Sequence, residues 1–310
     1  MDARKRETPG ALIKTDPRCA ACVRSEAVVA GKAVGGRAGV AASTEAQGIV
    51  DRGLSSERTP SVWLTEVHRI AAKAAGSGKA PFEAARNVIR AAAVGLVQHA
   101  EREIAGAADA KARFAIASRW AAAATHLDPR AAGLGSELAK PEELAEQVIK
   151  IANGPLAVDD SEIAFELLKK SRNVLFVHDG LGELSLDRLL VEEILKTAKR
   201  VYSAVSAVPL GGRATLDDLH RVGLAEVVTE IFPVGRGEVG VVWEEASSDF
   251  KGKLEVVDLI VSKGQANVYA LHDREKEILK PMYCLFRTQC DPIAEVFGQK
   301  GRVTVLKVWK

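Results

Sequence analysis

The sequence predicts an α/β protein, in which a Rossmann-like, mostly parallel sheet flanked by helices is preceded by an all-helical domain. Two observations lead to this fold class. The first half of the chain has apolar residues at three- and four-residue steps, as amphipathic helices do. The second half alternates short apolar runs with helical segments, the pattern of parallel strands buried between helices. We therefore expect an N-terminal segment over 1–60, a helical domain over 61–152 and an α/β domain over 153–310.

Length and charge limit the classes of protein to which the chain can belong. Its 310 residues are enough for about two domains with large cores. The 43 Lys and Arg residues against 41 Asp and Glu leave a net charge of +2, which argues against a nucleic-acid or membrane-surface partner. Four cysteines form no disulfide framework, and no apolar run reaches the ~20 residues of a membrane span. We expect a cytoplasmic protein with no nucleic-acid or membrane partner.

The first half of the chain divides into two parts of different composition. Residues 1–60 are rich in Ala and Gly and almost free of aromatic side chains, so we expect short helices, loops or partial disorder there. Between Val62 and Lys150 three helical runs are expected, because apolar residues recur with helical spacing. Pro81 suits the first turn of the second run, and Ala110–His126 forms the third.

The second half contains six expected strands and four expected helices. Val174–Val177 is wholly apolar without alternation, as in a buried parallel strand. The expected strands are Val174–Val177, Val201–Val205, Val227–Phe232, Val256–Val261, Tyr283–Phe286 and Val303–Val308. The expected helices are Leu184–Lys199, Thr215–Arg221, Val268–Leu279 and Ile293–Phe297, the second of them capped by Thr215.

A polar loop over residues 178–183 follows the first expected strand. Ligands of open parallel sheets bind at the carboxyl ends of the strands, where this loop lies. Asp179 can hold a divalent cation there, and the following helix start can accept an anion. An ordinary turn, in which an acidic residue caps the helix, explains the same pattern. His178 could be a metal ligand or base, although such a histidine is more often packed at the rim of a site.

A second polar loop over residues 262–267 follows the strand Val256–Val261. Lys263 supplies a positive charge, Gly264 allows close backbone approach and Asn267 adds an amide, which together suit a phosphate group. An ordinary solvated turn is the alternative. Asp258 lies within the expected strand, so its charge needs a partner, either Lys263 or a metal.

Four segments of the chain match the motifs of one known family. These are the Asp-Gly-Leu-Gly-Glu run 179–183, the Ser-Lys-Gly-Gln-Ala-Asn run 262–267, the segment 285–294 with its Arg, Cys and Pro, and Pro-Arg-Cys-Ala-Ala-Cys at 17–22. They resemble the metal-dependent damage-control phosphatases, a former domain-of-unknown-function family. That family also places a helical region before its α/β region, and the resemblance covers most of this chain.

The resemblance implies a metal-dependent phosphatase of small phosphorylated metabolites, such as sugar phosphates. Its cofactor would be a divalent metal, namely Mn²⁺, Co²⁺, Ni²⁺ or Mg²⁺. The implied site residues are Asp179 and Glu183 as catalytic groups, Asp179 and Asp258 as metal ligands, and Lys263, Gly264 and Asn267 as phosphate-binding groups.

Three departures from the family's motifs lead to a second interpretation. Gly180 stands where the family has a metal-binding Asn, and in the loop 209–215 Gly212 and Arg213 replace the family's Asn-Asp pair. One carboxylate holds such a metal poorly, and a cation beside it repels the metal. Arg213 could instead fill the space of the metal, pair with Asp179 and bind a phosphoryl group. The alternative is therefore a catalytically impaired relative that binds a phosphorylated ligand or a protein partner.

The cysteines allow one more site. Cys19 and Cys22 have the Cys-x-x-Cys spacing of a redox pair or of half a zinc site. Cys284 and Cys290 could complete a zinc site, but their apolar surroundings favour a role in the core.

Overall fold

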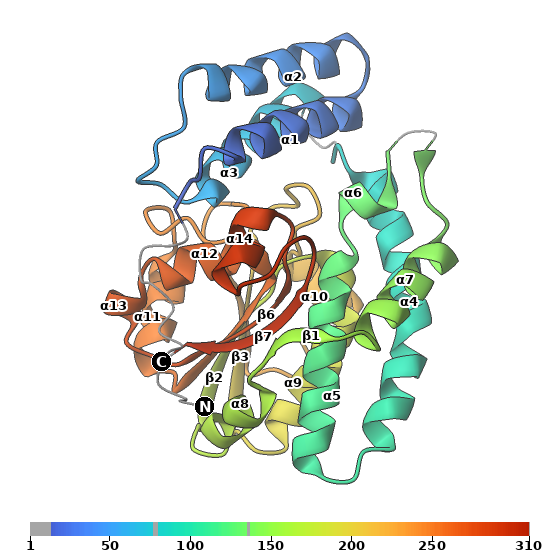
Figure 1. The fold of residues 1–310 in the computed structure, drawn as a ribbon, viewed down its shortest axis with the longest axis vertical. Coiled ribbons are helices and arrows are strands. Elements are labelled where there is room, and N and C mark those ends of the chain that lie inside the picture. The colour runs from blue at the N-terminus through green and yellow to red at the C-terminus, as the bar shows by residue number, and fades with distance from the viewer. Residues whose placement is uncertain (1–13, 77–79, 135–136, 310) are drawn as a thin grey trace.

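A seven-stranded sheet with helices on both faces forms the centre of the molecule (Figure 1). The structure is a computed structural model, and it describes residues 14–76, 80–134 and 137–309. The strand order is β1-β7-β6-β5-β2-β3-β4. The strands are β1 Leu156–Asp159, β2 Asn173–Val177, β3 Arg200–Val205, β4 Glu230–Pro233, β5 Leu259–Lys263, β6 Met282–Arg287 and β7 Thr304–Trp309. The predicted fold class is confirmed.

Five neighbouring strands, β6, β5, β2, β3 and β4, run parallel, whereas β7 is antiparallel to β6 and parallel to β1. All six predicted strands form, although β4 and β5 each begin three residues later than the ranges starting at Val227 and Val256. The edge strand β1 was not predicted. Three of its four residues are partly buried and Asp159 is exposed, so the strand lacks the long apolar run that marks the inner strands.

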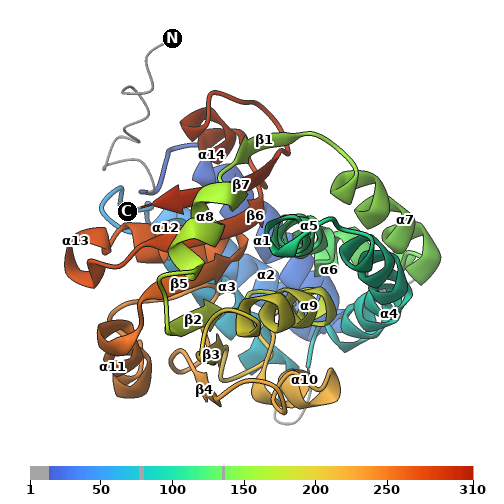
Figure 2. The same ribbon diagram turned by 90° about the horizontal axis from the view of Figure 1, so that it is seen from below.

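The helices of the described residues pack on the two faces of the sheet and, at one end of the molecule, on one another (Figures 1 and 2). They are α1 Cys19–Val34, α2 Gly36–Asp51, α3 Pro60–Ala75, α4 Glu83–Ala105, α5 Ala110–Ala123, α6 Pro129–Ala132, α7 Pro141–Ala152, α8 Ser161–Leu168, α9 Leu184–Leu195, α10 Leu216–Arg221, α11 Ser248–Val256, α12 Gly264–His272, α13 Glu275–Ile278 and α14 Asp291–Val296. The predicted helix Val268–Leu279 divides into α12 and α13, and α8 and α11 were not predicted.

Alternate residues of the strands face the two helix layers. In β2, Val174 and Phe176 belong to the core shared with α4, α5 and α9, whereas Leu175 and Val177 belong to the core shared with α11 and α12. Both faces of the sheet are therefore buried, which explains why the inner strands are continuously apolar.

Helices α1, α2 and α3 form a three-helix unit, called the cap below, at one end of the molecule (Figure 1). The prediction of short helices, loops or partial disorder over 1–60 is corrected for residues 19–51, because α1 and α2 are 16 residues long each. The first 13 residues lie outside the described part of the chain. The small residues of α1 and α2 are close-packing positions: a Cβ on Gly31 would lie 2.6 Å from the carbonyl oxygen of Gly39. The division of the chain at residues 60 and 152 stays a prediction, and α3 contacts α1 and α2 closely.

Candidate functional site

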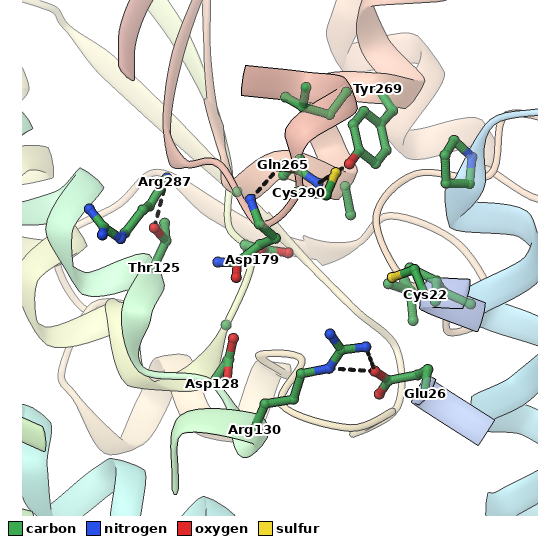
Figure 3. A pocket seen from close by; sticks show the side chains of 18 of the residues that line it. Cys22, Glu26, Thr125, Asp128, Arg130, Asp179, Gln265, Tyr269, Arg287 and Cys290 are labelled. Carbon is green, nitrogen blue, oxygen red and sulfur yellow. Dashed lines mark hydrogen bonds and ion pairs between the residues drawn. The ribbon is translucent and has the colours of Figure 1, made fainter. Parts of the chain in front are cut away.

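A pocket of about 640 Å³ lies between the cap and the carboxyl ends of β2, β5 and β6 (Figure 3). Both predicted loops reach it, because Asp179 follows β2 and Gly264 follows β5, which is its neighbour in the sheet. The opposite wall comes from α1 and α3, with side chains such as Cys22 and His68. The pocket is thus enclosed by segments from both ends of the chain.

Asp179 lies in the middle of this pocket, against the first residue of α12 (Figure 3). Gly264 has a φ of +74°, and a Cβ there would overlap the Asp179 carboxylate. Both the backbone conformation and the lack of space beside Asp179 therefore require glycine. The carbonyl oxygen of Asp179 accepts a hydrogen bond of 3.0 Å from the backbone N–H of Ala214. This bond and the bridge between Gly180 and Arg213 hold the loop 209–215 beside the end of β2.

The guanidinium of Arg213 forms an ion pair with the Asp179 carboxylate. Its Nη2 also donates to the side-chain oxygen of Asn267 at 3.3 Å. The side chain is 7% exposed, and its Nε is buried without a hydrogen-bond partner among the described residues. Burial lowers the pKa of Arg213 to about 10, with Glu238 acting in the opposite direction, so the group stays charged at neutral pH. The pairing considered in the sequence analysis is present.

Behind Asp179, four side chains form a buried network around Lys263. Its Nζ is paired with a carboxylate oxygen of Glu183 and, at 2.7 Å, with Oδ1 of Asp187. The other oxygen of Asp187 lies 2.9 Å from Nδ1 of His178, whose Nε2 lies 3.0 Å from the Ser203 hydroxyl. Lys263 is 0% exposed and is committed to two carboxylates. The structure therefore does not place its amine in the pocket, where a phosphate would need it.

Burial and the ion pairs together set the pKa values in this network. Burial raises the pKa of Glu183 to about 7, although Lys263 acts against the shift. Burial alone would lower the pKa of Lys263, but Asp187 and Glu183 outweigh it and the pKa lies above its usual range. Burial also lowers the pKa of His178, with Asp187 opposing, so this imidazole is neutral at pH 7. His178 is packed behind the site rather than exposed to a ligand.

Asn267 and Asp258 have structural partners. The Asn267 amide donates to the carbonyl oxygens of His178 and Lys263, both at 2.9 Å, and so fastens α12 to the end of β2. Asp258 lies before β5, at the amino end of the sheet, where it accepts backbone hydrogen bonds from Arg172 at 2.8 Å and Asn173 at 2.9 Å. A whole strand separates it from Asp179. Asp179 follows β2, whereas Asp258 precedes β5. The two residues expected to bind a metal together therefore lie at opposite ends of the sheet.

Arg287 is a pocket residue that the sequence analysis did not single out. It ends β6, and its backbone N–H donates to the Thr125 hydroxyl at 3.0 Å (Figure 3). Burial lowers its pKa, but a guanidinium remains charged at neutral pH. Among the described residues no carboxylate forms an ion pair with it, and its Nε is buried without a partner. Its position in the motif 285–294, directly at a predicted strand end, was the available signal.

Arg130 and Glu26 contact each other along one side of the pocket (Figure 3). Nε of Arg130, on α6, donates to the Glu26 carboxylate of α1 at 2.7 Å, and Glu26 also pairs with Nε2 of His68 at 3.0 Å. Burial would raise the pKa of Glu26, but His68 and Arg130 lower it to about 2. This pairing needs three helices from distant parts of the chain, so no local sequence pattern indicates it.

Cys19, Cys22 and Cys290 also line the pocket, whereas Cys284 is buried in the core. All four are free thiols. Within the described parts of the chain, no three His, Cys, Asp or Glu side chains are grouped so that they could hold a metal ion. A zinc site of these cysteines is therefore not supported.

The residues around Asp179 do not fit the divalent metal that the resemblance implies. Gly180 contributes no side chain, and the Arg213 guanidinium contacts the carboxylate that would be the first ligand. Hard divalent cations need several oxygen ligands, and a fixed positive charge at contact distance opposes them.

The comparisons with known proteins agree with the motifs. The model of the damage-control phosphatase ARMT1-like domain family matches residues 15–303. The chain belongs to this family. A damage-control phosphatase of Pyrococcus horikoshii is 31% identical over 54% of the chain and 58% of its own length. One of Archaeoglobus fulgidus is 31% identical over 51% of the chain and 53% of its own length.

These matches to curated relatives span about half the length of each relative. A solved structure, of a DUF89 family protein from Pyrococcus horikoshii, shares the fold over 96% of this chain and 99% of its own, with a TM-score of 0.81 and 23% identity. None of the helices in the described ranges is long and apolar enough to cross a membrane.

Proposed function

We propose that this member of the damage-control phosphatase family binds a small phosphorylated metabolite, and that Arg213 replaces the divalent metal of the site. The observation that carries the proposal is the ion pair between Arg213 and Asp179. It neutralises the carboxylate, and it leaves the Nε–H of the guanidinium without a hydrogen-bond partner among the described residues, in a side chain that lines the pocket. A guanidinium suits phosphate oxygens because its N–H groups match their geometry.

Two further features support a phosphoryl site at this end of the pocket. Arg287 supplies a positive charge that no described carboxylate pairs. Helix α12 begins at Gly264 without a side-chain cap, so its first backbone N–H groups and its dipole favour an anion. Lys263 supports this site only indirectly, by holding Glu183 and Asp187 behind it.

Metal-dependent hydrolysis, including that of sugar phosphates, is the second candidate. It is favoured by the retained Asp179 carboxylate, which still lines the pocket. The two candidates differ in one respect. Ligand binding through Arg213 needs no metal, whereas hydrolysis by the family's chemistry loses its water-activating group when a chelator is present.

Calorimetric titration of phosphorylated metabolites, with chelator and with Mn²⁺, tests the proposal. We expect binding that the chelator leaves unchanged and that Arg287→Gln weakens about tenfold or more, since a charged hydrogen bond contributes roughly 1.5–3 kcal/mol. Arg200→Gln is the matched control, because Arg200 is exposed at the other end of the sheet. Phosphate release that requires Mn²⁺ and is lost in Asp179→Ala would favour the second candidate and refute replacement of the metal.

A further inference from the structure

The side chains along the walls of the pocket indicate which kind of ligand body fits beside the phosphoryl group. The surface of the pocket is mostly carbon, and the apolar side chains come from the cap, from the loops after β3 and β4, and from α12 and α14. The apolar side chains concerned are Leu64, Leu210, Val239, Tyr269, Ile293 and Val296.

The charged side chains near these walls are already paired with one another. Arg130 donates to Glu26 at 2.7 Å. Arg18 is held by both oxygens of Glu295, at 2.8 and 2.9 Å, and by Asp16. A ligand that bonded to these groups would have to break existing ion pairs. These ion pairs leave few charged groups along the walls free to receive ligand hydroxyls, while Nδ1 of His68, a lining residue, is without a partner among the described residues.

The chemistry of the ligand body follows from this distribution. A polyol placed here would lose hydrogen bonds to water and regain few from the walls, and unpaired buried hydroxyls are costly. An apolar or aromatic body would instead exchange water for carbon contacts on two sides. The volume of about 640 Å³ accommodates such a body beyond the phosphoryl group.

We propose that the pocket selects phosphate monoesters with an apolar or aromatic body over sugar phosphates. This inference rests on the proposed binding of a phosphorylated metabolite and specifies its class. The phosphoryl group lies at Arg213 and Arg287, and the body extends between the cap helix α3 and helices α12 and α14.

The test compares naphthyl phosphate with a hexose phosphate of nearly the same size, by calorimetric titration of the full chain in chelator. We expect naphthyl phosphate to bind at least tenfold more tightly. Val239→Asn should reduce this ratio severalfold. The backbone N–H of Val239 is held by the Thr65 hydroxyl at 2.9 Å, so the loop itself stays anchored when the side chain changes. Val296→Asn is a second, independent wall variant.

Val94→Asn is the matched control, because Val94 is 71% exposed on α4, away from the pocket. It should leave the ratio unchanged. Equal binding of the two esters, tighter binding of the hexose phosphate, or a ratio insensitive to both wall variants would overturn the inference while the phosphoryl site stands. If neither ester binds, the proposed function fails as well.

Discussion

At the scale of single residues, Arg213 determines the charge beside Asp179. A carboxylate that keeps its position after β2 but gains a guanidinium partner presents a neutral pair to the pocket. Restoring the family's oxygen ligands should therefore reverse the effect. Gly180 is the second position, and a Cβ there would lie 2.8 Å from Oε1 of Glu183, so that carboxylate must move slightly to admit a side chain.

The double variant Gly180→Asn/Arg213→Asp should bind Mn²⁺, because it replaces a repelling cation by two oxygen ligands next to Asp179. Titration calorimetry with Mn²⁺ measures the gain, and phosphate release shows whether activity accompanies it. Gly180→Asn alone is the control and should gain little, since Arg213 still pairs with Asp179. A folded double variant that binds no Mn²⁺ would show that Arg213 is not what excludes the metal.

The sequence predicts which residues lie close together where their positions depend only on the topology of the sheet. Asp179 and Gly264 meet because they follow neighbouring parallel strands. The phosphate-binding role expected for Lys263 did not take account of the alternation of side chains along a strand. Lys263 shares the face of Leu259 and Val261, which is covered by α9, and so it points at Asp187 instead of the pocket. Long-range pairing with a helix residue is not visible in the local pattern.

At the scale of elements, the helices of the cap show how composition can mislead. The Ala and Gly content of residues 1–60 predicted short helices, loops or partial disorder, yet these small residues allow α1 and α2 to pack with their backbones nearly in contact. Glycine costs helix stability in isolation, so tertiary packing has to compensate. The close approach at Gly31 and Gly39 is that compensation.

Gly31→Ala should destabilise the protein by about 1–3 kcal/mol, because its Cβ would lie 2.6 Å from the Gly39 carbonyl oxygen and 2.7 Å from Cβ of Ser43. Gly95→Ala is the matched variant on α4, where a Cβ meets no atom within 4 Å, and it should stabilise by about 0.5–1 kcal/mol. Urea denaturation measures both. Equal effects of the two variants would contradict close packing as the reason for Gly31.

At the scale of the whole molecule, the sequence predicted the layers but not how the cap sits on them. The alternation of apolar runs and helical segments predicted the sheet. The direction of β7 and the presence of the edge strand β1 depend instead on pairing between distant segments. The pocket likewise depends on contacts across the chain, such as Arg130 with Glu26 and Arg18 with Glu295. These contacts connect the cap to the α/β part and enclose the site.

Glu26 should therefore make the stability of the molecule acid-sensitive. Its pKa is about 2 in the folded chain against 4.5 for the free side chain, so the unfolded chain binds more protons between these values. The pairing contributes about 3 kcal/mol above pH 4.5, and this contribution is lost as the pH falls towards 2. Glu26→Gln should accordingly lower the free energy of unfolding by about 2–3 kcal/mol at pH 7 and by less than half as much at pH 3, measured by urea denaturation.

Glu101→Gln, at an exposed position of α4, controls for the loss of a carboxylate and should change little at either pH. A Glu26→Gln deficit that is the same at both pH values would mean that packing, and not the charge of Glu26, connects the cap to the rest of the molecule.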